Sequence, residues 1–179
     1  MIRACLARFG SDVRGVSVVE FALVAPIMVT TFLGMVEINN LTTSYGKAVT
    51  AAQTVADLVT QSPSLTTMQA SSIVVGAQRT LDPLISTTAN MSVDISSIAF
   101  DATGKPYQAW TYHWGMASSP PSPTLAAGMG AANESVIVTV LNYTCTPVIH
   151  NIVPQITFNQ TAFSRPRTTL KIAFNGVTG

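Results

Sequence analysis

The longest run of apolar residues lies near the N-terminus and predicts a membrane-spanning helix. It covers residues 16–36 and contains one charged residue, Glu20, close to its start. About 20 predominantly apolar residues are needed to cross the hydrocarbon core of a bilayer as a helix, so the run is long enough. A removable secretory signal has a shorter apolar region followed by a small-residue cleavage site, and residues 37–41 offer no such site. The pattern therefore favours a retained span.

Beyond the span, apolar residues continue at helical spacing. Steps of four and three residues separate Leu41, Tyr45, Ala48, Ala52, Val55 and Val59. Such spacing places apolar side chains on one face of a helix. We therefore expect the first helix to run from about Val16 to Thr60, and the Ser-Pro-Ser sequence at residues 62–64 to end it.

The rest of the chain predicts one more helix and a sheet. Thr66 and Gln69 have the spacing of a capping box, and the helix that they start is expected to end at about Leu81, before Asp82-Pro83. Strand patterns follow at residues 92–100, 107–114, 135–143 and 156–163. A loop rich in Ser, Pro and Gly separates the second and third of these segments. Four mostly antiparallel strands with helices on one face make an α+β domain.

Composition narrows the possible functions. Charged residues make up 9% of the chain and the net charge is +1, against about 25% charged residues in ordinary soluble domains. We therefore expect no nucleic-acid partner. Cys5 and Cys145 lie on opposite sides of the predicted span, which excludes a disulfide between them. Cys145 is expected to be a small buried side chain, with an intermolecular disulfide or a reactive thiol as alternatives.

Candidate chemistry is sparse. His113 and His150, the two histidines, lack further ligands at metal-binding spacing, and no catalytic motif or phosphate loop is present. We therefore expect no enzymatic activity, no metal and no cofactor. Trp110, Tyr112 and Trp114 share one face of a predicted strand, where core packing is favoured over an aromatic ligand-binding surface.

The charges that flank the span predict its orientation. Basic residues are enriched before it and not after it, so the positive-inside rule places the N-terminus in the cytoplasm and exports everything beyond about Glu37. The flanking charges are Arg3, Arg8, Asp12 and Arg14 before the span, and Glu37, Lys47 and Asp57 after it.

The start of the span resembles the processing site of type IV prepilins and pseudopilins. Gly15 stands five residues before Glu20, which Phe21 follows. The resemblance implies that a prepilin peptidase cleaves after Gly15 on the cytoplasmic face, so that Val16 becomes the first residue of the mature chain. Without a side chain, Gly15 allows a protease to approach the backbone closely.

The longer segment at residues 14–37 resembles the TadE-like minor pseudopilins of the tight-adherence (Tad, or Flp) pilus system. The matching residues are Arg14, Gly15, Val19 to Leu23, Pro26, Gly34 and Glu37. Two weaker similarities lie further on, a Tyr-x-x-x-Pro segment within residues 138–147 and Arg165-Pro166. The resemblance implies a cytoplasmic leader at residues 1–15, a span at 16–36 and an exported pilin-like domain at 37–179.

The resemblance also implies a function and partners. The protein would support assembly of a surface pilus for adherence, together with prepilin peptidase, other pilins or pseudopilins and the Tad inner-membrane assembly proteins.

In such an assembly, the Glu20 carboxylate would meet the Val16 ammonium of a neighbour. The alternative to this pairing is that the Glu20 side chain only extends to the headgroup level at the membrane surface. Pro26, Gly34 and Glu37 are the other candidate assembly or helix-packing residues, although Pro26 is equally well explained as an incidental kink. The alternative function is a membrane-anchored adhesion domain that is neither processed nor polymerised.

Overall fold

The computed structural model describes residues 16–147 and 154–178. The chain divides into two compact units, residues 1–40 and 41–179. The predicted α+β class is confirmed by a long N-terminal apolar helix, a second helix and a four-stranded antiparallel sheet.

Helix α2 (Val16–Gln61) is the longest element of the chain. It ends one residue beyond the predicted Thr60, because the Ser-Pro-Ser sequence that follows disfavours a further helical turn. Its first part contains an apolar window long enough to cross a membrane, and none of that window is buried. Its last part, from Leu41, belongs to the second unit.

Helix α3 (Thr67–Leu81) begins with the capping box that the sequence predicts. The Thr66 hydroxyl accepts a hydrogen bond from the Gln69 backbone N–H at 3.3 Å, and the Thr66 N–H donates to Gln69 Oε1 at 2.8 Å. These bonds satisfy N–H groups that have no partner inside the helix. The face toward the core carries Ala70, Val74, Ala77 and Leu81, and Ile73 beside it is half-buried.

The main sheet has the strand order β3-β2-β4-β5, and all neighbours are antiparallel. Its strands are β2 (Met91–Phe100), β3 (Pro106–Gly115), β4 (Ser135–Cys145) and β5 (Ile156–Ser164). Each extends a predicted segment by one or two residues. A second, parallel pair joins β1 (Ser64–Leu65) to β6 (Ala173–Phe174). The sequence did not predict this pair, because two residues are too few to show a periodic pattern.

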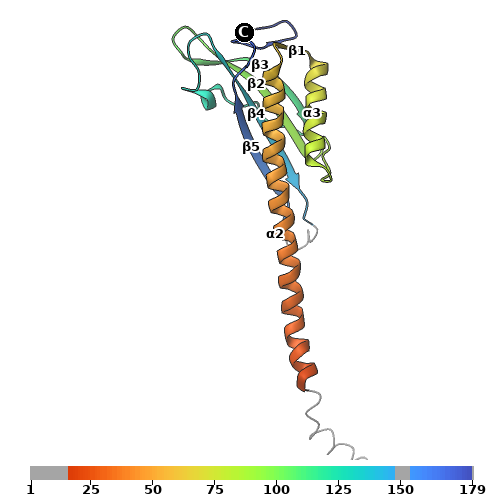
Figure 1. Ribbon diagram of the computed structural model, residues 1–179. Coiled ribbons are helices and arrows are strands. Elements are labelled where there is room, and N and C mark those ends of the chain that lie inside the picture. The colour runs from red at the N-terminus through yellow and green to blue at the C-terminus, as the bar shows by residue number, and fades with distance from the viewer. Residues whose placement is uncertain (1–15, 148–153, 179) are drawn as a thin grey trace, which may run out of the picture. The chain divides into compact units, whose positions relative to one another are not determined.

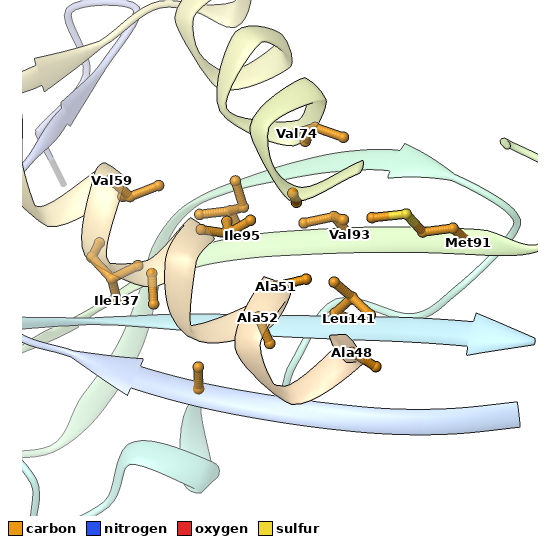
Figure 2. Packing of buried hydrophobic residues seen from close by; sticks show 14 of the residues in the cluster. Ala48, Ala51, Ala52, Val59, Val74, Met91, Val93, Ile95, Ile137 and Leu141 are labelled. Carbon is orange, nitrogen blue, oxygen red and sulfur yellow. The ribbon is translucent and has the colours of Figure 1, made fainter. Parts of the chain in front are cut away.

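One face of the sheet packs against the two helices and forms the larger core (Figure 1). Alanines along α2, at 48, 51 and 52, let this helix lie close to strands that carry Ile95, Ile137 and Leu141 (Figure 2). Trp110 also packs into this core, and its Nε1 donates a 2.7 Å hydrogen bond to the Ile172 carbonyl oxygen. The prediction of core packing for this residue is therefore confirmed.

The opposite face of the sheet is covered by the segment that the sequence predicts only as a loop. The short 3-10 helix η2 (Pro123–Ala126) lies within it, and Ala126 packs in a second core with Phe100 and Val138. A side chain at Gly130 would place its Cβ 2.3 Å from the Phe100 ring. Glycine thus lets the loop pass directly over the aromatic ring, so the sheet has a cover on both faces.

Candidate functional site

The first part of α2 presents an exposed apolar surface. Phe21, Leu23, Phe32 and Met35 are among its large side chains, and each is about two-thirds exposed or more. Burying such side chains in an apolar environment is strongly favourable. This surface is therefore suited to lipid or to the helices of other membrane subunits.

Two threonine hydroxyls within this apolar segment form hydrogen bonds inside the helix. The Thr30 hydroxyl donates to the Pro26 carbonyl oxygen at 2.7 Å, and the Thr31 hydroxyl donates to the Ile27 carbonyl oxygen at 2.8 Å. Such bonds to the preceding turn lower the cost of placing a hydroxyl in hydrocarbon. Pro26 lies inside the helix and has no N–H to donate to the Ala22 carbonyl.

The predicted processing site lies at the start of the described residues. Gly15 falls outside them, and Val16 is the first residue of α2. Val16 and Glu20 are four residues apart in this helix, which places them on the same helical face. Glu20 and Phe21 are both exposed, so the carboxylate is open to a partner from another molecule.

Gly34 and Glu37, the other two candidate assembly residues on this helix, have different surroundings. A Cβ built on Gly34 meets no atom within 4 Å among the described residues. The glycine therefore leaves a shallow, open position on the helix surface, as close helix packing between molecules requires. Glu37 is 3% exposed, so it offers a partner little of its surface.

The comparisons with known proteins point to one family. Residues 15–57 match the family model described as TadE-like protein. The N-terminal region of this chain is TadE-like. The match begins at Gly15, contains every candidate processing and assembly residue, and extends into the part of α2 that belongs to the second unit. No curated protein and no solved structure matches the chain.

Two arginines, on either side of Pro166, attach the segment after β5 to the rest of the domain. The Arg167 guanidinium lies 2.9 Å from Asp57 Oδ1, and the Arg167 N–H donates to the Thr60 carbonyl oxygen at 3.1 Å. Arg165 donates to the Met129 carbonyl oxygen and lies 3.8 Å from Glu134. These arginines therefore join the C-terminal segment to α2 and to the covering loop.

Sequence reasoning missed a polar cluster on the loop-covered face of the sheet. Asp94 is 1% exposed, and its Oδ1 lies 2.7 Å from His113 Nδ1 on the neighbouring strand. The Ser118 hydroxyl donates to Asp94 Oδ2. The register pairs Asp94 directly with His113. The alternation of side chains along the two strands could have placed both residues on one face of the sheet, but it brings them together only when the strand pairing is known.

This cluster has the residue types of a hydrolase triad without the geometry. In a Ser-His-Asp triad the serine contacts Nε2 and the aspartate contacts Nδ1. Here Ser118 Oγ lies 3.3 Å from His113 Nδ1, the nitrogen that also faces Asp94. The serine proton is directed to the carboxylate, so the histidine does not activate it. The cluster instead satisfies a buried carboxylate and fixes the start of the covering loop.

Three groups outside this cluster have pKa values that are shifted by their surroundings in the fold. The Thr103 hydroxyl, followed by the Lys105 N–H, lowers the pKa of Asp101 in an exposed turn. Burial raises the pKa of Tyr112 and of Tyr143, and the Tyr143 hydroxyl donates to the Ile85 carbonyl oxygen at 3.1 Å. None of these groups belongs to the polar cluster or to the TadE-like helix start.

Cys145 is 8% exposed, and its Sγ lies 3.6 Å from Ser44 Oγ. It is a free thiol among the described residues, which agrees with the expected small buried side chain. Cys5 and His150 lie outside the described residues. Within residues 16–147 and 154–178, no three His, Cys, Asp or Glu side chains are grouped so that they could hold a metal ion.

Proposed function

We propose that this protein is a minor pseudopilin or pilin that supports assembly of a Tad/Flp-type surface pilus for adherence. The observation that carries the proposal is the TadE-like match over residues 15–57. An exposed apolar helix that continues into a packed α+β domain supports it, because a pilin-type subunit needs both parts. TadE-like pilus proteins are structural, so the proposed role includes no enzymatic activity.

The protein is proposed to reside in the bacterial inner membrane with its N-terminus in the cytoplasm. The basic bias before the span supports this orientation. The domain would then lie on the periplasmic or extracellular side, where the Tad inner-membrane proteins and the other pilins would meet it. Prepilin peptidase would act on the cytoplasmic side, at Gly15.

Cleavage after Gly15 would create an ammonium at Val16. The Glu20 carboxylate, which is exposed, would then pair with the ammonium of a neighbouring subunit. An unpaired charge in a low-dielectric environment is costly, so this pair would set the register between neighbouring subunits. Open Gly34 would allow close approach of a second helix at the other end of the span.

Deletion of the gene tests the proposed function. We expect surface pili to be lost and adherence to fall, because an assembly factor is required before polymerisation proceeds. Electron microscopy of pili and a surface-binding assay provide the readouts, and the full-length gene supplied in trans should restore both.

A chimera separates the proposed function from that of an anchored adhesion domain. In it, residues 1–36 are replaced by an unrelated span of the same orientation. The chimera should reach the membrane and restore neither pili nor adherence. Normal piliation of the deletion strain would contradict an assembly role. Adherence restored by the chimera without pili would identify the domain as an anchored adhesin.

A further inference from the structure

We draw no further inference here: the strongest candidate, the open outer edge of strand β5 in the four-stranded sheet, carries nothing, because no feature of the described residues shows what covers it.

Discussion

Glu20→Gln should leave cleavage and membrane insertion intact and should sharply reduce incorporation with pilin or pseudopilin partners. Glutamine preserves the shape of the side chain but removes the charge, so the Val16 ammonium of a neighbour loses its partner. Breaking a buried ion pair by removing one member typically costs about 3–5 kcal/mol. This cost outweighs the gain from placing a neutral side chain in the membrane. Co-purification of the cleaved variant with its partners measures the effect.

Glu20→Asp is the control for charge. It retains the carboxylate on a shorter side chain and should restore incorporation in part. If the shape of the side chain mattered and its charge did not, Glu20→Asp would be incorporated no better than Glu20→Gln. Co-purification of Glu20→Gln at the wild-type yield would show that the carboxylate does not pair with a neighbouring ammonium. That result would instead support a Glu20 that only reaches the membrane surface.

Gly115→Ala should strongly destabilise the α+β domain. The backbone φ at this position is +101°, and a Cβ would lie 2.1 Å from the Met91 carbonyl oxygen and 2.9 Å from Ser92 Cα. Both contacts are to backbone of the adjacent strand, so rotation of a side chain does not relieve them. Backbone strain alone costs about 1–3 kcal/mol, and the displaced strand adds to this cost. The melting temperature of the full chain in detergent should fall by about 10 °C or more.

Gly104→Ala separates strain from collision. Gly104 also has a positive φ, +79°, but no atom lies within 4 Å of the position that a Cβ would take there. This variant should lose only the strain contribution, a few degrees of melting temperature. Equal melting temperatures for the two variants would contradict the close approach of β3 and β2 at Gly115.

Local patterns were sufficient to predict most of the second unit. The Thr66–Gln69 capping box predicted the start of α3. The side chain of each residue accepts a hydrogen bond from the backbone N–H of the other, so the motif does not depend on the rest of the fold. Alternation along residues 135–143 predicted β4, because opposite faces of that strand enter two different cores. The observed strand ends differed from the predicted ends by few residues, since the end of a strand depends on the hydrogen-bond partners in the neighbouring strand.

Features made by distant segments were not predictable in this way. The Asp94–His113 contact exists only because β2 and β3 pair in one particular register. The loop around η2 has little apolar periodicity, yet it covers a sheet face through Ala126 and a glycine at 130. The processing site is the reverse case: the sequence pattern at Gly15 predicts it, and it lies at the limit of the described residues.

The mature N-terminus tests the central claim most directly. Intact-mass and N-terminal peptide mass spectrometry of the protein, extracted from membranes of cells with active prepilin peptidase, identifies the first residue. We predict a chain that begins at Val16, with residues 1–15 removed. A chain that retains these residues in such cells would contradict the pseudopilin function and would favour a permanently anchored domain.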